Sequence, residues 1–599
     1  MCGIIGYAGK NRCMPLIFDM LKRLEYRGYD SVGVSVITET NATPRLYTVK
    51  DRGTVDALRN ATSFVDAYIG IGHTRWATCG APLKHNAHPF TDCKNEIAVA
   101  HNGIIENYKS LRDELMREGH VFSSETDSEV VAHLIEKYYR GSLMDAVQKA
   151  IARLEGSYAL VILHKDERKI IGIRHESPLI LGVRKDEYFL SSDIPGFLEH
   201  TNRVVYLNDD EIVEITSSGF SVYDTSGNRL EKKISEITWT IEDAEKGGFE
   251  HYMLKEIHEI PRAVQDTIRG KIDSSILELD FDAYDRILLV GCGTSYHAAL
   301  YGKYLFEKLL KIPAYAEISS EIRNSSMAMA NTLALFITQS GETADTLAAA
   351  RNLKKLGAQT CAVTNVLGSS ITRETNAVFY THAGPEISVA ATKTFVSQIT
   401  ALYLLATEIG VQRGEITKGL EAEIKNTLRI LPSELNKVLS EPEKIIDAAK
   451  KLAGYDNVFY IGRGFNYPIA LEGALKLKEI SYIHAEGYPA GELKHGPLAL
   501  LSEKVPVVAI ATYDALYSKM LGNIAEVKAR NAPVFLVCSE NHDEARDMAD
   551  YVIEMPENHD IVTPVLTVTA LQLLAYYTAR ERGCPIDKPR NLAKSVTVE

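Results

Sequence analysis

A cysteine stands one residue from the start of the sequence, in the run MCGIIGYAG. The residues after Cys2 are small or apolar and predict a short buried strand. Removal of Met1 in front of this small residue would make Cys2 the N-terminus, with its thiol and its α-amine on one carbon. Because an α-amine has a reference pKa of about 8, it could take the thiol proton near neutral pH and activate a nucleophile. The alternative is that Cys2 is a small buried hydrophobe, as most free cysteines are.

The turn TQSGET, residues 338–343, offers three hydroxyl groups, one amide and a glycine that opens backbone N–H groups to a ligand. It follows an apolar run typical of a buried strand and precedes a helical pattern. A donor-rich turn at the start of a helix suits a phosphate monoester. An ordinary Ser/Thr helix cap is the alternative, but three hydroxyl groups around one glycine favour phosphate.

A third group of titratable residues lies between positions 475 and 497, where the sequence reads LKLKEISYIHAEGYPAGELKHGP. We expect the end of a helix followed by a loop. Lysine, glutamate and histidine beside glycine and proline on a loop are typical of functional segments. One lysine or glutamate alone would indicate only a solvated surface, so the density of these residues carries the prediction.

Two cofactor hypotheses follow from motifs, and neither is favoured. The turn GCGTS at 291–295 matches part of a dinucleotide fingerprint, but it lacks the third glycine and a ribose-binding acid at the proper distance. Histidines and cysteines also crowd one region of the chain without C-x2-C or H-E-x-x-H spacing. We therefore expect no metal and no redox cofactor. The crowded residues are His73, Cys79, His85, His88, Cys93 and His101.

The elements that must position these residues fall into two halves. The first 240 residues alternate strand patterns with two amphipathic helices, at 15–24 and 128–139, and predict an α+β domain of layered sheets. Its expected strands cover 33–39, 97–105, 158–165, 169–175, 188–193 and 203–215. Residues 241–250 are acidic and then glycine-rich, as a linker would be.

The second half repeats one plan of buried strand, glycine turn and long helix. The segment from 286 resembles that from 457, and the segment from 331 corresponds to that from 505. This order predicts two doubly wound α/β domains with parallel sheets. The expected boundaries are a first domain at 1–240, α/β domains at 251–430 and 431–588, and a tail at 589–599.

Composition limits the class of protein. The 599 residues carry a formal net charge of -13, which argues against broad binding to nucleic acid or to an acidic membrane. No uninterrupted apolar run approaches the ~18 residues of a membrane helix, and no signal peptide is visible. The eight cysteines are scattered along the chain, which favours reduced thiols in the cytoplasm.

Six segments occur together and in order: CGI at 2–4, HTRWAT at 73–78, HNG at 101–103, TDSE at 126–129, SGET at 340–343 and LAKSVTVE at 592–599. From residue 2 to the last residue the chain resembles the glutamine–fructose-6-phosphate aminotransferase (isomerizing) family. The resemblance implies an αββα N-terminal-nucleophile glutaminase domain followed by two flavodoxin-like sugar isomerase (SIS) domains. It also implies synthesis of glucosamine 6-phosphate and glutamate from fructose 6-phosphate and glutamine, without a cofactor.

In the glutaminase half the resemblance makes Cys2 the nucleophile, with its own amine moving protons. It places Asn102 and the Gly103 N–H in the oxyanion hole. Arg75 would bind the α-carboxylate of glutamine and Asp127 its α-ammonium group. By the same resemblance Trp76 gates an internal ammonia channel, and the further pocket residues are Thr78 and His88.

In the isomerase half the resemblance makes Lys594 the Schiff-base amine and Glu479 the base that moves a proton between C1 and C2, with Lys476 beside it. His495 would open the sugar ring from the neighbouring subunit of a homodimer, and the tail would act as a lid. The residues of the implied sugar-phosphate site are Ser295, Thr338, Gln339, Ser340 and Thr343. The chain departs from the family where Thr338 replaces a serine, which keeps the hydroxyl, and where Cys79 replaces a common histidine.

Two other functions fit parts of the sequence. A glutamine amidotransferase that aminates phosphoribosyl pyrophosphate would share the first half, but it would need a different phosphoribosyl loop in place of the paired α/β domains. A non-catalytic sugar-phosphate sensor could share the SIS domains. Such a sensor would have no reason to keep the glutaminase residues Cys2, Arg75, Asn102 and Asp127. It would also have no reason to keep Lys594, His495 and Glu479.

Overall fold

The structure is a computed structural model that describes residues 2–40, 43–76, 80–237, 245–272, 279, 281–512, 514–540, 543–556 and 562–597. Thr78, Cys79 and residues 241–244 of the expected linker lie outside the described residues. The chain forms two compact units, Met1–Ala244 with Ala593–Glu599, and Glu245–Leu592.

The first unit contains two antiparallel sheets. One has the strand order β15-β11-β9-β10-β1-β4-β2-β3 and the other β14-β13-β12-β8-β7-β6-β5. The strands of the first sheet are β1 (Gly3–Gly9), β2 (Ser31–Thr40), β3 (Thr43–Arg52), β4 (Ala67–Arg75), β9 (Ile180–Arg184), β10 (Glu187–Ser191), β11 (Arg203–Tyr206) and β15 (Ser235–Glu236). Those of the second are β5 (Phe90–Thr91), β6 (Ile97–Ile105), β7 (Gly156–His164), β8 (Glu167–His175), β12 (Glu211–Ile215), β13 (Phe220–Tyr223) and β14 (Arg229–Leu230).

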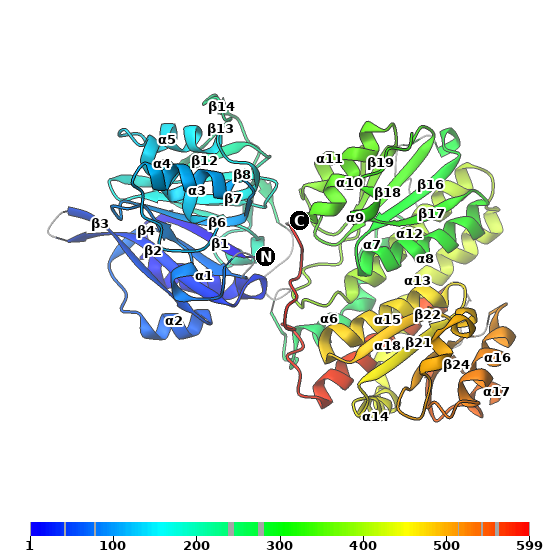
Figure 1. The fold of residues 1–599 in the computed structure, drawn as a ribbon. Coiled ribbons are helices and arrows are strands. Elements are labelled where there is room, and N and C mark those ends of the chain that lie inside the picture. Colours follow the sequence, from blue (N-terminus) through cyan, green and yellow to red (C-terminus); the bar gives the residue numbers. More distant parts are fainter. Residues whose placement is uncertain are drawn as a thin grey trace. The chain divides into compact units, whose positions relative to one another are not determined.

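The two sheets pack face to face between helices (Figure 1). Ile4 and Ile71 of the first sheet share one buried cluster with Ala100 and Val161 of the second. Full burial of an isoleucine or valine side chain contributes roughly 1.5–3 kcal/mol to the stability of the fold. Helix α1 packs on β1 and β4, whereas the second sheet carries α4 on its outer face. The helices are α1 (Cys13–Leu24), α2 (Val55–Ala61), α3 (Tyr108–Arg117), α4 (Glu129–Tyr138) and α5 (Leu143–Ile151).

This αββα order confirms the predicted fold class of the first half and corrects two details of it. The sequence pattern predicted two helices, near α1 and α4, but the structure adds α2, α3 and α5. The expected strand 203–215 is two strands, β11 and β12, which belong to different sheets. A single apolar pattern cannot reveal such a crossing, because both strands alternate towards the same buried cluster.

The second unit contains two parallel five-stranded sheets with orders β17-β16-β18-β19-β20 and β22-β21-β23-β24-β25. Both orders run 2-1-3-4-5, as in a flavodoxin-like fold, so the predicted pair of doubly wound domains is confirmed. The strands of the first sheet are β16 (Arg286–Gly291), β17 (Ala314–Ile318), β18 (Thr332–Thr338), β19 (Gln359–Thr364) and β20 (Ala377–Tyr380). Those of the second are β21 (Asn457–Gly462), β22 (His484–Pro489), β23 (Val507–Ala511), β24 (Val534–Ser539) and β25 (Tyr551–Met555).

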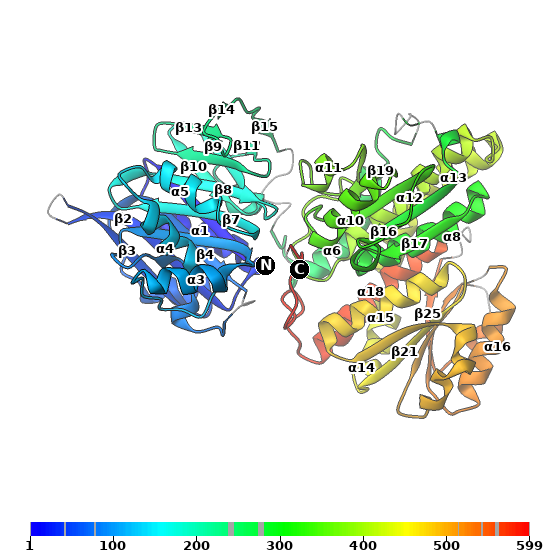
Figure 2. The same ribbon diagram turned by 45° about the horizontal axis from the view of Figure 1, so that its top comes forward.

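Long helices fill the space between these two sheets (Figure 2). Leu289 of β16, Leu402, Leu477 and Leu571 belong to one continuous buried cluster, so both α/β layers share a core. The helices of this unit are α6 (Tyr252–His258), α7 (Ile260–Ile268), α8 (Thr294–Leu310), α9 (Ser319–Ile322), α10 (Ala344–Lys355), α11 (Ile371–Glu374), α12 (Lys393–Gln412), α13 (Lys418–Ser440), α14 (Glu443–Leu452), α15 (Asn466–Ser481), α16 (Tyr517–Lys528), α17 (Asp543–Arg546) and α18 (Thr563–Glu581).

Helix α12 is long and apolar enough to cross a membrane by length and composition alone, with a mean hydropathy of 1.3 over its best window. That window is 89% buried inside the unit. The core helix of a soluble α/β protein has these properties too, so the helix is explained by its packing.

Candidate active sites

The first site forms where the N-terminal strand meets β4. Strand β1 pairs with β4 so that Gly3 lies opposite Thr74, and Trp76 follows the end of β4. The Trp76 N–H donates to Cys2 Sγ at 3.3 Å, and the Cys2 thiol lies 3.6 Å from the Trp76 carbonyl oxygen. The predicted nucleophile is therefore half-buried and held by the backbone.

Asn102 reaches the same point from strand β6 of the other sheet. Its Nδ2 donates to the Cys2 carbonyl oxygen at 3.0 Å. Its Oδ1 lies 3.0 Å from His73 Nε2, which is also 3.0 Å from the His101 carbonyl oxygen. Because both partners are acceptors, His73 Nε2 carries the hydrogen and fixes which end of the amide faces Cys2. Burial, the largest effect, lowers the pKa of His73 to about 3, so the ring is neutral.

Gly103 follows Asn102 in a conformation that favours glycine. Its φ is 125°, and a Cβ built there would lie 2.0 Å from the Ser157 carbonyl oxygen on the paired strand β7. A side chain at this position would push β6 away from β7 or turn the backbone. The glycine therefore sets the direction of the chain directly after Asn102.

Arg75 and Asp127, the predicted glutamine-binding pair, are both buried and both anchored to backbone groups. The Arg75 guanidinium donates to the carbonyl oxygens of Ala81 at 3.3 Å and Gly80 at 3.1 Å. Asp127 Oδ2 accepts the Ile105 N–H at 2.9 Å. Buried charges are retained when they are paired or hydrogen-bonded, and these contacts hold one charge of each sign ready for a zwitterionic ligand.

His88, a pocket residue by the resemblance, lies in a stack of buried histidine rings beside Asn102. Its ring stacks on His73, with centroids 4.0 Å apart and an interplanar angle of 12°, and its Nδ1 accepts the His101 N–H at 3.3 Å. Burial first, and then the nearby His73 and Arg75, hold the pKa of His88 well below its usual range. The residue contributes to a neutral histidine stack that supports Asn102. Thr78 lies outside the described residues.

The second site follows the carboxyl ends of β16 and β18, which are neighbours in the sheet. In this strand order the connections leave β16 and β18 in opposite directions, and such a switch point is where doubly wound sheets bind ligands. Ser295 stands in the first turn of α8 after β16, and its Oγ accepts a hydrogen bond from Gln398 Nε2 at 3.0 Å. The structure thus places Ser295 and the 338–343 turn on the same edge of one sheet.

The 338–343 turn is rigidly built. Thr338 Oγ1 accepts the Gly341 N–H at 3.2 Å, and Ser340 Oγ accepts the Glu342 N–H at 3.2 Å. Gly341 has a φ of 69°, and a Cβ there would lie 2.1 Å from Ser369 Oγ. Thr343 is the N-cap residue of α10. Hydroxyl groups and helix N–H groups therefore converge before α10, as the phosphate hypothesis requires.

The predicted pair Lys476 and Glu479 lies on α15, in a buried network of charges. Lys476 Nζ is 2.7 Å from Glu479 Oε2 and 3.4 Å from Glu472 Oε1, and it donates to Thr294 Oγ1 at 3.1 Å. Burial alone would lower the pKa of Lys476, but Glu472 and Glu479 raise it above its ordinary value. Glu472 Oε2 also lies 2.7 Å from His297 Nδ1 of α8. The lysine is thus a permanent cation that fixes the Glu479 carboxylate.

Three members of this network were missed by sequence reasoning. Thr294 and His297 lie one turn apart at the start of α8, and Glu472 precedes Lys476 by four residues on α15. The i,i+4 and i,i+3 spacings of Glu472, Lys476 and Glu479 place them on one helix face, a signal that could have been read. The partners on α8 could not be read, because the helices meet only in the fold.

The remaining predicted residues are not joined to this network by the described contacts. His495 is exposed, at the end of a 3-10 segment, Ala490–His495. The preceding stretch 484–489, expected as a loop, is the edge strand β22. Lys594 belongs with Ala593–Glu599 to the first compact unit, whereas Lys476 and Glu479 belong to the second.

Comparison with known proteins agrees with both halves. A family model described as a glutamine amidotransferase domain matches residues 73–199, and one described as a SIS domain matches residues 281–408 and 451–581. Glutamine–fructose-6-phosphate aminotransferase (isomerizing) from Methanosarcina acetivorans is 48% identical over 623 residues, and its namesake from Caldanaerobacter subterraneus is 46% identical over 612 residues. Each of these two comparisons covers 100% of both chains.

A solved structure supports the second unit. The C-terminal domain of glucosamine-fructose-6-phosphate aminotransferase from Francisella tularensis is 40% identical, with a TM-score of 0.56. The similarity covers 58% of this chain and 100% of that domain. The full-length identity, the two matched domain types and their order together confirm the resemblance seen in the motifs. The chain belongs to the glutamine–fructose-6-phosphate aminotransferase (isomerizing) family.

Proposed function

We propose that this protein converts fructose 6-phosphate and glutamine into glucosamine 6-phosphate and glutamate. Family membership supports the overall reaction. The observation that carries the glutamine half is the position of Cys2, whose thiol accepts the Trp76 N–H at 3.3 Å beside the Asn102 amide. A structural cysteine would not need a hydrogen-bond donor at its sulfur and an amide from the opposite sheet.

Glutamine hydrolysis would begin when Cys2 Sγ attacks the side-chain amide carbon. The thiol proton passes to the α-amine of Cys2 and then to the leaving nitrogen, so that ammonia and a thioester form. Asn102 Nδ2 and the Gly103 N–H would stabilise the oxyanion, with roughly 3–4 kcal/mol for each donor. Water then attacks the thioester through a second oxyanion and releases glutamate and the free thiol.

Glutamine recognition would use the two anchored charges. Arg75 offers a planar fork to the α-carboxylate, and Asp127 accepts the α-ammonium group. Trp76, whose N–H already contacts Cys2, would gate the passage of ammonia, and Thr78 and His88 remain the further expected pocket residues. Unprotonated ammonia is the nucleophile needed at the sugar, so the family's internal channel would keep it from water.

The sugar half would hold fructose 6-phosphate by its phosphate at the β16–β18 edge. His495 from the partner chain opens the ring, and Lys594 forms a Schiff base at the C2 ketone with loss of water. Ammonia displaces the lysine amine from C2, and Glu479 moves a proton from C1 to C2 to give the amino aldose. Lys476 would hold the Glu479 carboxylate in place. The proposed phosphate ligands are Ser295, Thr338, Gln339, Ser340 and Thr343.

We further propose a homodimer located in the cytoplasm. The exposed position of His495 supports the dimer, because a ring-opening acid has to be covered by another surface before it can act. The scattered cysteines support a reducing compartment. The proposed domain boundaries remain 1–240, 251–430 and 431–588, with a tail at 589–599 that acts as lid.

The variant Cys2→Ala tests the proposal. We expect glutamine hydrolysis to fall by roughly 10⁴-fold or more, as for loss of other catalytic nucleophiles. Isomerisation of fructose 6-phosphate, which does not use the Cys2 thiol, should persist. The control Cys13→Ala removes a buried thiol of α1 from the same domain and should keep both reactions. Retained glutamine hydrolysis in Cys2→Ala would refute the assignment of the nucleophile.

A further inference from the structure

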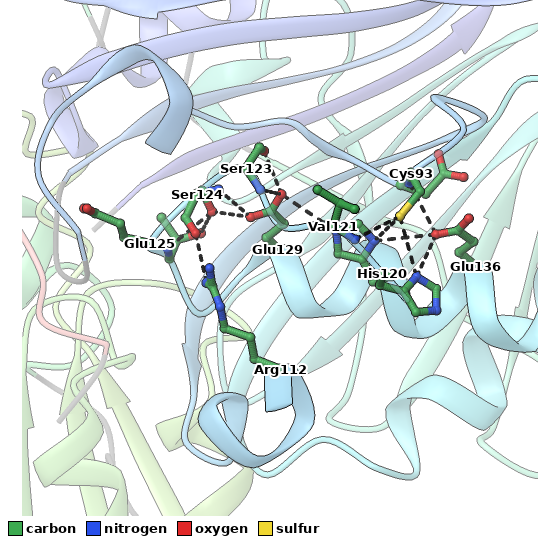
Figure 3. A network of polar contacts seen from close by, with 12 residues as sticks. Cys93, Arg112, His120, Val121, Ser123, Ser124, Glu125, Glu129 and Glu136 are labelled. Carbon is green, nitrogen blue, oxygen red and sulfur yellow. Dashed lines mark hydrogen bonds and ion pairs between the residues drawn. The ribbon is translucent and has the colours of Figure 1, made fainter. Parts of the chain in front are cut away.

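Four side chains with metal-binding atoms meet in the first unit. Figure 3 labels three of them, Cys93, His120 and Glu136. They are Cys93, from the loop between β5 and β6, His120, from the loop after α3, and His133 and Glu136 of α4. One ligand atom of each residue lies within 4.8 Å of the corresponding atom of every other. None of the four has a role in the proposed reaction.

The distances between four pairs of these atoms, 3.0–3.7 Å, lie near those around a tetrahedral ion. Cys93 Sγ lies 3.7 Å from His120 Nδ1 and 3.5 Å from His133 Nδ1. Glu136 Oε2 lies 3.0 Å from His120 Nδ1 and 3.5 Å from His133 Nδ1. With zinc bonds of about 2.1 Å to nitrogen or oxygen and about 2.3 Å to sulfur, a tetrahedron separates its ligand atoms by about 3.3–3.6 Å.

A carboxylate behind His133 prepares its other nitrogen for coordination. His133 is buried, and its Nε2 lies 3.7 Å from Glu129 Oε1. The Glu129 carboxylate accepts hydrogen bonds from the backbone N–H and hydroxyl groups of Ser123 and Ser124, at 2.7–2.8 Å. A fixed anion at Nε2 favours the hydrogen on that atom and leaves the Nδ1 lone pair directed at the cluster. Metal-binding histidines commonly have such a carboxylate partner.

A network of hydrogen bonds alone accounts for only part of this arrangement. Glu136 Oε2 accepts the Cys93 N–H at 3.2 Å and faces His120 Nδ1, and Cys93 Sγ accepts the Val121 N–H at 3.4 Å. The lone pair of His133 Nδ1 then faces the same carboxylate oxygen and the sulfur. One thiol proton cannot serve every acceptor here, whereas one cation would satisfy a thiolate, a carboxylate and two imidazole nitrogens.

We propose that Cys93, His120, His133 and Glu136 form a site for one divalent zinc ion. A thiolate with two imidazoles suits zinc, and four protein ligands make a closed, structural site. The ion would join the β5–β6 loop, the loop after α3 and helix α4. Because α4 begins directly after Asp127 and Ser128, the ion would also hold the segment that carries the proposed ammonium ligand. The sequence predicted no metal, because the ligands do not form a short motif. His120 lies 27 positions after Cys93.

Metal analysis of the full-length protein, purified without an affinity tag, tests the site. After equilibration with a slight excess of zinc and removal of free ion, we expect about one zinc per chain. Cys93→Ser, His120→Ala and Glu136→Gln should each lose most of it. Two controls should keep it: His85→Ala, which removes an exposed histidine of the same domain, and Cys2→Ala, which excludes chelation by an N-terminal thiol and amine. Zinc-free wild type, or zinc lost from Cys2→Ala and kept in Cys93→Ser, would overturn the proposal.

Cobalt(II) substitution gives a second measurement. Its result in the wild-type protein does not depend on whether any variant folds. We expect the intense visible bands of tetrahedral cobalt together with a thiolate-to-cobalt charge-transfer band in the near ultraviolet. Cys93→Ser should lose the charge-transfer band, and His85→Ala should keep it. Weak octahedral bands without charge transfer in the wild type would contradict the assigned ligands.

Discussion

The histidines around Cys2 illustrate how buried rings can orient a neighbouring side chain. His73, His88 and His101 are buried and lie between the two sheets beside Asn102. Burial is the largest effect on each, and it lowers the pKa of all three rings. A neutral His73 can donate one hydrogen bond and orient the Asn102 amide, without placing a positive charge next to the nucleophile.

These lowered pKa values predict an acid-sensitive first unit. Below pH 6.5, and for His73 down to about pH 3, the unfolded chain binds more protons at these histidines than the folded chain does, so the free energy of unfolding falls as the pH falls. Above about pH 6.5 this contribution is constant. We expect the urea midpoint, followed by tryptophan fluorescence, to be lower at pH 5 than at pH 7.5. Both tryptophans, Trp76 and Trp239, lie in this part of the chain.

The matched variants are His73→Gln and His85→Gln. The first removes a buried titrating ring and should weaken the dependence of the midpoint on pH, even if it lowers the midpoint itself. The second removes an exposed ring and should keep the dependence of the wild type. A wild-type midpoint that is equal or higher at pH 5 would contradict the neutral histidine stack.

Residue types in short motifs could be read from the sequence, and contacts across elements could not. The family motifs contain Cys2, Asn102 and Asp127, so the sequence alone predicts these residues. His73 belongs to a motif as well, but its support of Asn102 depends on the pairing of two sheets. The zinc ligands come from three segments, and only His133 and Glu136 share a helix face at i,i+3 spacing.

At the scale of elements, the turn between β18 and α10 is tightly constrained, and it belongs to the proposed sugar-phosphate site. Gly341→Ala should raise the KM for fructose 6-phosphate by roughly tenfold or more, because φ is 69° and the new methyl group would lie 2.1 Å from Ser369 Oγ. Glutamine hydrolysis takes place in the other unit and should be unchanged. Steady-state kinetics of the two half-reactions would measure both effects.

Gly357→Ala is the control for this prediction. Gly357 also has a positive φ, 97°, but the nearest atom to an added Cβ lies 3.7 Å away. The control should therefore cost some stability and leave the KM near that of the wild type. An equal rise in KM for both variants would show that backbone strain, and not displacement of the turn, is responsible.

The order of strands and helices was easier to predict than their pairing. The repeated strand, glycine turn and helix pattern predicted both parallel sheets, since each strand is buried on two faces and reads as an apolar run. The helices α2 and α3 were missed because each buries only two side chains. Helix α5 has a regular apolar face with Leu143, Val147 and Ala150, which could have been read from the sequence. The segment 484–489 contains glycine and proline, and its composition therefore indicated a loop. In the structure it is an edge strand of a sheet.

At the scale of the whole molecule, the buried charges between α8 and α15 join the two α/β layers of the second unit. Glu472→Ala would leave Lys476 buried with one carboxylate fewer and His297 without its partner, at a cost of about 3–5 kcal/mol. We expect a lower urea midpoint for the second unit. We also expect slower isomerisation, because Lys476, the partner of Glu479, loses the anchor that Glu472 provides. Far-ultraviolet circular dichroism follows this helical unit.

Asp447→Ala provides the comparison, because it removes a mostly exposed partner of Lys450 on α14. Surface ion pairs contribute little to stability, so its midpoint should stay close to that of the wild type. If Glu472→Ala behaved like Asp447→Ala, the buried network would not join the two layers.

The proposed synthesis of glucosamine 6-phosphate requires nitrogen to pass from glutamine to the sugar within one protein. The most direct measurement incubates the full-length protein with glutamine labelled with nitrogen-15 in the side-chain amide and with fructose 6-phosphate, and follows the products by mass spectrometry. We predict label in a hexosamine phosphate and an equal amount of glutamate, with little labelled ammonia in solution. Glutamate and labelled ammonia without a labelled amino sugar would contradict the transfer, and absence of glutamate would contradict the role of Cys2.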